Sequence, residues 1–209
     1  MADSTTGENS TNNSIFSEYS ENSKKRNEIA SALVQSPDIK LITTIADLLK
    51  DICNENNSIE VNNKNIEINK KIKLFMLKKI PPISIKDYLL RLSKYSKISA
   101  STLIFILIYI DRRLCYKYKF KINYFNIYKF ILASLVISVK YNEDDFFSSE
   151  FYAKLGGISK TEMNYLEYEF ISMINFNLYI KEDLFFKYHD LLINDEKYDS
   201  NEEEKEKEE

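Results

Sequence analysis

Few residues of this chain could do chemistry. His189 is the only histidine, and it stands beside Asp190 in a C-terminal stretch that we expect to be solvated. A lone histidine in such a stretch is typical of a surface residue and not of a general base. The glycine pair Gly156-Gly157 precedes a helix start and does not fit the pattern of a phosphate-binding loop. The sequence therefore predicts no catalytic residue, no cofactor site and no small-molecule substrate, so the protein is not expected to be an enzyme.

Three consecutive carboxylates leave one enzyme hypothesis open. Glu143, Asp144 and Asp145 follow an apolar segment, and carboxylate oxygens are the ligands that hard cations prefer. A metal-dependent helical enzyme would use these three side chains. A group of acidic residues just after a helix is more typical of a solvated turn, and Cys53 and Cys115 lack the spacing of metal ligands. We therefore predict no metal site.

Composition predicts an all-α protein with one domain. The 209 residues include three glycines and three prolines, too few for the many tight turns of a sandwich or barrel. Long stretches rich in Leu, Ile, Lys and Glu favour helices. The formal net charge is -3, and we find no extended stripe of basic and aromatic residues, so nucleic acid is not expected as a partner.

The chain is expected in the cytoplasm, the nucleus or both. Its first residues, MADSTTGENSTNNS, lack the basic and apolar regions of a signal peptide. The longest apolar runs, 103–110 and 130–139, fall well short of the roughly 20 residues needed to span a bilayer, so no membrane association is expected. Two cysteines that form no disulfide framework suit a reducing compartment.

The chain divides into a helical domain and two polar ends. Residues 1–35 contain few apolar anchors and are predicted to be disordered. The domain covers 36–193 and opens with an amphipathic helix over 37–53, in which apolar residues recur every three or four positions. Residues 54–73 are rich in Asn and Lys and are predicted to be a loop insertion. The acidic tail 194–209 is predicted to be disordered.

The segment 82–178 is predicted to hold five helices. Ser84, Ser99 and Ser159 are placed to cap helices, and Glu162 makes a capping box with Ser159. The second and third helices are apolar on nearly every side and should form the buried centre. The predicted helices cover 84–95, 99–118, 124–141, 149–155 and 159–174, with a further short helix over 181–193.

Five segments in this order carry a family resemblance. They read PISIKDYLLRLSKY, YIDRRL, ISVKYNEDD, EFYAKLGGIS and LEYEFISMINFNL, and they fall between Pro82 and Leu178. Together they resemble the cyclin box of the P/U-type cyclins, the group that includes the plant P-type and the yeast phosphate-pathway cyclins. The resemblance implies a five-helix box preceded by an N-terminal helix. It also implies a regulatory subunit that binds and activates a cyclin-dependent serine/threonine kinase as a heterodimer.

The resemblance also implies which residues meet the kinase. Lys140 and Glu167 match the kinase-facing lysine and glutamate of the family, although taken alone they are ordinary residues of a helix end and a solvated helix face. We expect apolar residues to surround both charges, which is typical of an interface centre. The full expected surface is Ile137, Lys140, Tyr141, Asp144, Glu167, Tyr168, Ile171 and Phe176, with Leu178 nearby.

A structural ion pair is expected from the same resemblance. Arg91 and Asp111 match paired charges of the family, and an aspartate on an apolar helix needs a partner because a desolvated charge is costly. The alternatives are that both face solvent, or that Arg112 or Arg113 takes Asp111.

Two departures from the larger cyclins limit the prediction. The Met-Arg-Ala-Ile-Leu run that recruits substrates is replaced by ISIKDYLL, and the chain holds one helical repeat. A cyclin-fold adaptor or transcription-factor-like scaffold that binds no kinase is the alternative function. The Asn, Lys and Ile bias suggests an AT-rich genome such as that of a protist. Which kinase is bound, and whether the role lies in cell-cycle timing, nutrient signalling or transcription, stays open.

Overall fold

The computed structural model describes residues 8–56 and 66–194. All regular elements in these two ranges are helices and none is a strand, which confirms the all-α prediction. In chain order they are α1 (Glu8–Leu33), α2 (Ile39–Asn56), α3 (Ile66–Phe75), α4 (Ile85–Ser96), α5 (Ala100–Ile108), the π-helix η1 (Tyr109–Tyr116), α6 (Ile127–Asn142), α7 (Ser149–Gly156), α8 (Lys160–Met173) and α9 (Glu182–Asn194). None of these helices is long and apolar enough to cross a membrane.

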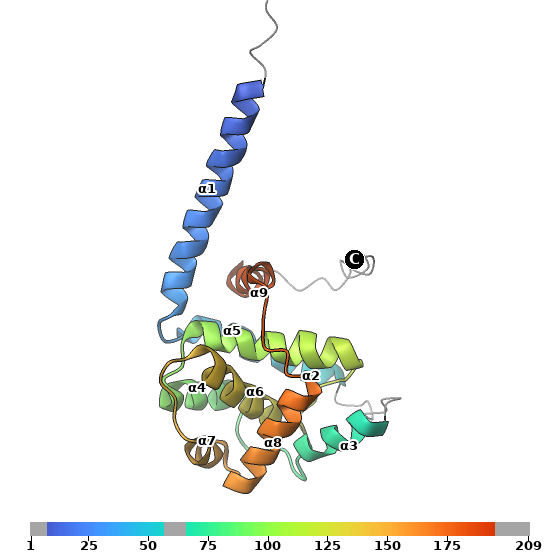
Figure 1. The fold of residues 1–209 in the computed structure, drawn as a ribbon. Coiled ribbons are helices and arrows are strands. Elements are labelled where there is room, and N and C mark those ends of the chain that lie inside the picture. The colour runs from blue at the N-terminus through green and yellow to red at the C-terminus, as the bar shows by residue number, and fades with distance from the viewer. Residues whose placement is uncertain (1–7, 57–65, 195–209) are drawn as a thin grey trace, which may run out of the picture.

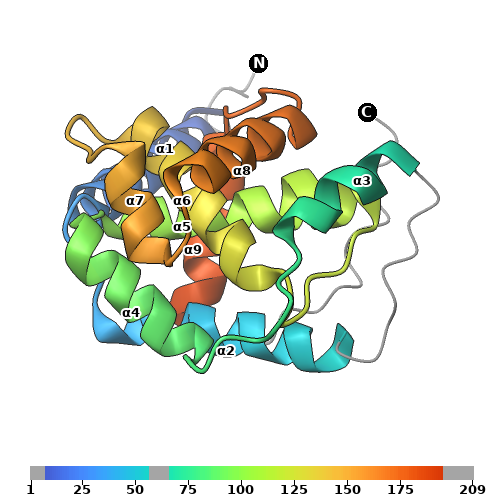
Figure 2. The ribbon, with the colours of Figure 1, turned by 90° about the horizontal axis from the view of Figure 1, so that it is seen from below.

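Helix α6 lies at the centre of the molecule. Nearly every side chain from Ile127 to Val139 is buried, as the apolar sequence predicted. Helices α3, α5, α7 and α8 contact α6, and α2 packs against α4. Figures 1 and 2 show α4, α7 and α8 gathered around α6, with α9 across the outer side of α5. The core therefore forms around one helix that has almost no solvent face.

Serine caps fix the starts of four helices. The side chains of Ser84, Ser99, Ser148 and Ser159 each accept a hydrogen bond from the backbone amide three residues later. Such a bond satisfies one of the free amides of the first turn. The three caps predicted from sequence are confirmed, and Ser148 adds a fourth. Helix α7 is capped at its C-terminus by Gly157, whose φ of 74° is a left-handed conformation that glycine adopts without strain.

The second predicted helix changes its geometry halfway. Residues 100–108 are α-helical, whereas Tyr109 to Tyr116 form a π-helix with wider turns. Tyr109 is completely buried at this change, and Asp111 lies in the first wide turn. Periodicity predicted a helix over 99–118 but not this widening, because both helix types place apolar residues at similar intervals.

Part of the segment 1–35 that was predicted to be disordered forms a helix. Residues 8–33 form α1, which projects from the molecule (Figure 1), and residues 1–7 lie outside the described ranges. Its last turns are attached: Leu33 is buried, and Arg26 pairs with Asp183 at 2.9 Å. Arg26 also lies over the ring of Phe186. The attachment depends on α9, which is far away in sequence, so composition alone could not predict it.

The predicted loop insertion over 54–73 is also corrected. Helix α2 continues to Asn56, and α3 begins at Ile66 and buries Ile72 and Phe75, while residues 57–65 lie outside the described ranges. The ring of Phe75 stacks on Phe130 of α6 with centroids 4.2 Å apart. Ile72 and Phe75 therefore anchor α3 to the core.

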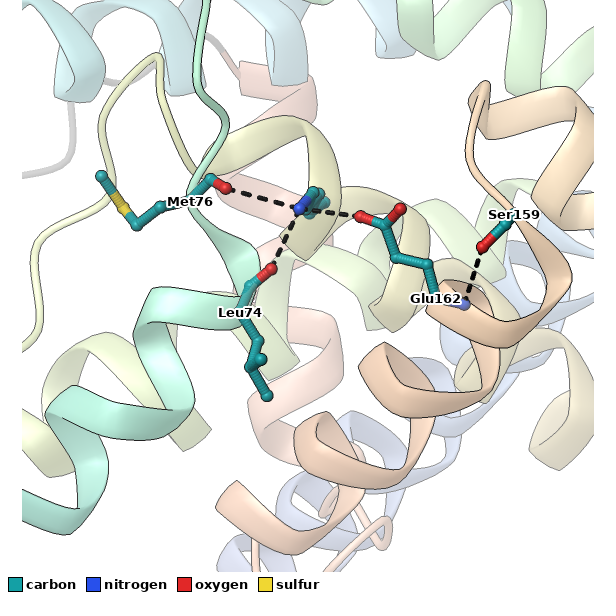
Figure 3. A network of polar contacts seen from close by, with 5 residues as sticks. Leu74, Met76, Ser159 and Glu162 are labelled. Carbon is teal, nitrogen blue, oxygen red and sulfur yellow. Dashed lines mark hydrogen bonds and ion pairs between the residues drawn. The ribbon is translucent and has the colours of Figure 1, made fainter.

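A lysine of α6 ties the end of α3 to the start of α8. The ammonium of Lys129 donates to the carbonyls of Leu74 and Met76 at 3.0 and 3.4 Å and pairs with Glu162 at 2.8 Å (Figure 3). The Glu162 amide donates to Ser159, so half of the predicted capping box is present, while the Glu162 carboxylate turns to Lys129. The contact satisfies carbonyls at the end of α3 that helix geometry leaves free.

The C-terminal helix corrects the prediction for His189. Helix α9 covers Glu182–Asn194, close to the predicted 181–193, and the rest of the predicted tail lies outside the described residues. His189 is 7% exposed and its Nδ1 lies 2.9 Å from Asp190. It is therefore a buried residue and not a surface one, because α9 packs against α2 and α5.

Candidate partner-binding surface

Lys140 and Glu167 meet where three helices converge. Lys140 stands in the last turn of α6, where the helix dipole favours a cation. Its ammonium lies 2.5 Å from Glu167 Oε1 in the middle of α8 and donates to the Ser149 hydroxyl at the start of α7, at 3.2 Å. The two residues that the sequence singled out from separate segments are therefore brought together.

The pair is partly shielded and still accessible. The Lys140 side chain is 32% exposed and that of Glu167 is 22% exposed. An ion pair in this position contributes little to stability because water screens it from one side. A partner that excluded this water would strengthen the charges and could hydrogen-bond with both. The arrangement therefore offers both a donor and an acceptor to a partner surface.

Aromatic side chains next to the pair are exposed. Tyr141 follows Lys140 and is 50% exposed, and Tyr168 follows Glu167 and is 61% exposed. Ile171, one turn after Glu167 on α8, is half-buried against the core. Asp144 is exposed just after α6. Large aromatic side chains that a folded protein leaves in water are typical of contact surfaces.

One predicted surface residue lies in the core. Ile137 is 3% exposed, so the prediction that it flanks Lys140 on the surface is wrong. Helix periodicity placed it correctly, one turn before Lys140, but α7 and α8 both pack against α6 and bury this part of it. Such covering depends on the neighbouring helices and cannot be predicted from one helix alone.

A strained turn presents Phe176 to solvent. Asn175 and Phe176 both have a φ of 56°, a left-handed conformation that is costly for residues with a Cβ, above all for a bulky one. The Phe176 side chain is nevertheless 64% exposed. Three buried or half-buried side chains donate hydrogen bonds to the backbone around this turn. Tyr118 donates to the carbonyl of Met173 just before it. Tyr109 and Arg113 donate to the carbonyls of Leu178 and Tyr179 just after it. The sequence offered no glycine here as a signal for such a turn.

Glu143 has a structural role that separates it from the other two carboxylates of the metal hypothesis. Its Oε1 accepts hydrogen bonds from the Ser99 amide, the Ser99 hydroxyl and the Thr102 hydroxyl at 3.0, 2.6 and 2.5 Å. Burial alone would raise the pKa of Glu143, but these hydrogen bonds outweigh it and hold the pKa below its ordinary value. Within the described ranges, no group of three or more His, Cys, Asp or Glu side chains is arranged to hold a metal ion.

The predicted ion pair between Arg91 and Asp111 is not formed. Arg91 lies at the surface and donates to the Leu155 carbonyl of α7 at 2.5 Å. Asp111 accepts a hydrogen bond from the Tyr188 hydroxyl of α9, and its cationic neighbour is Arg112 at 3.9 Å. The alternative that Arg112 takes Asp111 is therefore the one observed. The sequence predicted a helix over 181–193 but could not show that this helix brings Tyr188 to Asp111.

One short segment interleaves aromatic and basic residues. From Tyr116 to Lys121 the two kinds of residue alternate. Lys117 lies over the ring of Tyr118 at 5.0 Å, and Lys119 over that of Tyr116 at 4.5 Å. The rings thus contact the protein's own lysines, and the expectation of no nucleic-acid partner stays a prediction.

Comparison with known proteins gives one family. The family model described as Cyclin matches residues 6–178. Cyclin-U4-1 of Arabidopsis thaliana is 29% identical over 163 residues, which are 77% of this chain and 79% of that protein.

Two further relatives match over shorter stretches. Cyclin-U4-3 of Arabidopsis thaliana is 40% identical over 108 residues, covering 52% of this chain and 49% of that one. PHO85 cyclin-like protein psl1 of Schizosaccharomyces pombe is 38% identical over 122 residues, covering 57% and 50%. The match therefore spans about half the length of these two relatives.

Proposed function

The chain belongs to the cyclin family, and from this premise we propose that it binds and activates a cyclin-dependent serine/threonine kinase. The contact surface would be centred on Lys140 and Glu167. The observation that supports this most directly is that the pair is preformed, partly exposed and flanked by the exposed rings of Tyr141 and Tyr168. One relative is named a PHO85 cyclin-like protein. The chain would act as a regulatory subunit, and the phosphoryl transfer would belong to the kinase.

The geometry suggests how the surface would bind. An ammonium has three N–H donors, and Glu167 and Ser149 use two of those of Lys140. The third can donate to a carbonyl at the end of a partner helix, while the carboxylate of Glu167 keeps acceptor positions for partner amides. Because both residues stand on packed helices, little conformational entropy would be lost on binding.

Activation would consist of positioning. A protein kinase needs the lysine of its nucleotide site, the glutamate of its αC helix and its magnesium-binding aspartate in place together. A rigid surface that binds better to the arranged conformation of the αC helix shifts the kinase towards it. Tyr141, Tyr168 and Phe176 would supply apolar contact area, and Asp144 is proposed to meet an arginine of the kinase.

Affinity purification of the full chain tests the proposal. The tagged chain is purified from its source cells, and its partners are identified by mass spectrometry and quantified. We expect a cyclin-dependent kinase as the main stoichiometric partner, and mixing the recombinant pair should raise the kinase's rate on a peptide substrate. Recovery of other proteins without a kinase would instead support the adaptor alternative. Microscopy of a fluorescent fusion tests the proposed location in cytoplasm, nucleus or both.

A further inference from the structure

Ser149 is a contact of Lys140 that the family resemblance did not indicate. It is the first residue of α7 and is partly exposed, and its hydroxyl accepts from the Lys140 ammonium at 3.2 Å. On its other side, Lys140 reaches Glu167 at 2.5 Å. Lys140, which the proposed function places at the centre of the surface, is therefore held between α7 and α8. Its hydrogen bond to the Glu167 carboxylate is the stronger of the two, and its hydrogen bond to the Ser149 hydroxyl is the weaker.

The neutral hydroxyl has a specific effect on the lysine. A carboxylate acting alone would draw the ammonium fully towards α8, since charge-assisted hydrogen bonds are about twice as strong as neutral ones. The serine hydroxyl holds it from the α7 side without adding a charge. The ammonium thus stays between the two helices, where its remaining donor is available to a partner.

A negative charge at position 149 would draw the Lys140 ammonium away from Glu167 and towards α7. A phosphorylated serine carries a charge of about -1.5 to -2 and three acceptor oxygens. At this position it would compete with Glu167 for Lys140 and repel the carboxylate of Glu167. Asp144 and Asp145 are also nearby in the chain, whereas Glu150 already pairs with Lys154 at 3.0 Å. The surface would change from one balanced pair to an excess of negative charge.

We propose that Ser149 positions Lys140 for the partner, and that Ser149 is a phosphorylation site whose modification switches this surface off. The proposal rests on the proposed function for its partner, and on the contact between Ser149 and Lys140 for its geometry. Residues 144–148 before it are all exposed, so a protein kinase can reach the segment in the free subunit. In the transfer from ATP, the serine oxygen bonds to the γ-phosphorus, the bond to the β-phosphate oxygen breaks, ADP leaves and the hydroxyl proton is released.

The first test needs no partner. The full chain is produced with phosphoserine incorporated at position 149, or at position 31 as a control, because Ser31 is exposed on α1 and contacts Asn27 instead. The ¹⁵N signal of the Lys140 ammonium, assigned by its loss in Lys140→Gln, should shift only with phosphoserine at 149. An unshifted signal would overturn the proposal, because the phosphate would then not reach Lys140.

The second test measures binding to the kinase recovered by affinity purification. Phosphoserine at 149 should weaken binding by about tenfold or more, while phosphoserine at 31 should leave it unchanged. Ser149→Ala should weaken binding by about threefold, as expected for one lost hydrogen bond to an exposed charge, and Ser149→Thr should restore it. Equal affinities for the chains with serine and phosphoserine at 149 would overturn the switch.

Mass spectrometry of the chain from source cells, with phosphatases inhibited, tests the modification itself. Phosphate on Ser149 should be found in chains free of the kinase and be depleted in the complex. A fully covered peptide without phosphate in both pools would overturn the assignment of the site. If the chain binds no kinase at all, the proposed function fails, while the Lys140 signal still shows whether Ser149 controls the lysine.

Discussion

Lys140 and Glu167 are predicted to contribute more to kinase binding than to folding. Either change, Lys140→Ala or Glu167→Ala, should alter the free energy of unfolding by only about 0.5 kcal/mol, because the pair is partly exposed and screened. The same changes should weaken kinase binding by about 2 to 5 kcal/mol, or about thirtyfold or more, since a charge left unpaired in a dry interface is costly. Thermal melts and titration calorimetry at one salt concentration measure both effects.

A second ion pair on α7 provides the matched control. Lys154 lies 3.0 Å from Glu150, and both side chains are more than half exposed. Lys154→Ala removes the same kind of charge from a neighbouring helix and should leave kinase affinity unchanged. If Lys140→Ala and Glu167→Ala bind as tightly as this control, the kinase does not use the surface around them.

A double-mutant cycle tests the separation of Arg91 and Asp111. Arg91→Ala removes one hydrogen bond to the Leu155 carbonyl and should cost about 1 kcal/mol, whereas Asp111→Ala removes the acceptor of Tyr188 and should cost about 1 to 3 kcal/mol. Because Arg91 contacts Leu155 of α7 whereas Asp111 contacts Tyr188 of α9, their effects on urea unfolding should add within about 0.5 kcal/mol. A larger coupling energy would show that they pair in solution.

Charged residues of the site were easier to predict than their surroundings. Lys140 and Glu167 were singled out because a family pattern fixes their positions, and the structure brings the two side chains into contact. Whether Ile137 faces water depends on how closely α7 and α8 pack on α6, and the contact of Ser149 with Lys140 depends on where α7 begins. Both are tertiary facts that no local pattern contains.

At the scale of elements, Glu143 fastens the end of α6 to the start of α5. Glu143→Ala should cost about 1 to 2 kcal/mol of stability, because the Ser99 amide and two hydroxyls lose their acceptor. Asp144→Ala, one residue along and exposed, should cost under about 0.5 kcal/mol. Urea unfolding of the three proteins measures the difference, and equal losses for the two variants would contradict the role of Glu143.

The stability difference between the wild-type chain and Glu143→Ala should depend on pH. The folded-state pKa of Glu143 lies below its ordinary value of 4.5, so its carboxylate stabilises the fold fully above pH 4.5. The contribution is lost as the pH falls from 4.5 through the lowered folded pKa. The stability advantage of the wild-type chain over Glu143→Ala should therefore shrink in this acidic window. An advantage that grew on acidification would show that the carboxylate is not the stabilising form.

The left-handed turn at Asn175 and Phe176 is predicted to lower the stability of the fold while it exposes an aromatic ring. Phe176→Gly and Phe176→Ala both remove the exposed ring, but only glycine relieves the left-handed backbone at this position. The glycine variant should be the more stable of the two by about 1 kcal/mol, while both should weaken kinase binding to a similar extent. Thermal melts and affinity of the two variants give the comparison. Equal stability would mean that the turn carries no strain.

Helix starts were predictable from sequence, whereas changes inside helices were not. Ser84, Ser99 and Ser159 mark helix starts because a short hydroxyl side chain caps the first turn wherever it stands. The π-helical turns from Tyr109 and the docking of α3 by Phe75 depend on contacts with distant segments. The helices between residues 82 and 178 were therefore predicted from the sequence, whereas most of α3 was assigned to a loop insertion.

At the scale of the whole molecule, the end of α1 belongs to the folded unit. Leu33 is 7% exposed, and the carbonyl of Gln35 just after α1 accepts from the Ala100 amide at 2.7 Å. That amide lies in the first turn of α5, where helix geometry leaves it without an acceptor in its own helix. The composition of residues 1–35 predicted disorder because apolar anchors such as Ile29 and Leu33 are diluted by polar residues.

Two truncations separate the attached end of α1 from the rest of it. A chain that begins at Glu21 keeps Arg26, Ile29 and Leu33 and should change the free energy of unfolding by less than about 0.5 kcal/mol. A chain that begins at Pro37 loses the burial of Leu33 and the acceptor at Gln35, and it should be destabilised by about 2 to 5 kcal/mol. Urea denaturation of both chains gives these values.

Leu33→Ala in the full chain should account for about 2 to 3 kcal/mol of the loss, because it removes the buried side chain and keeps the backbone acceptor. If the chain that begins at Pro37 is as stable as the full chain, α1 does not dock in solution and the prediction of disorder from composition holds.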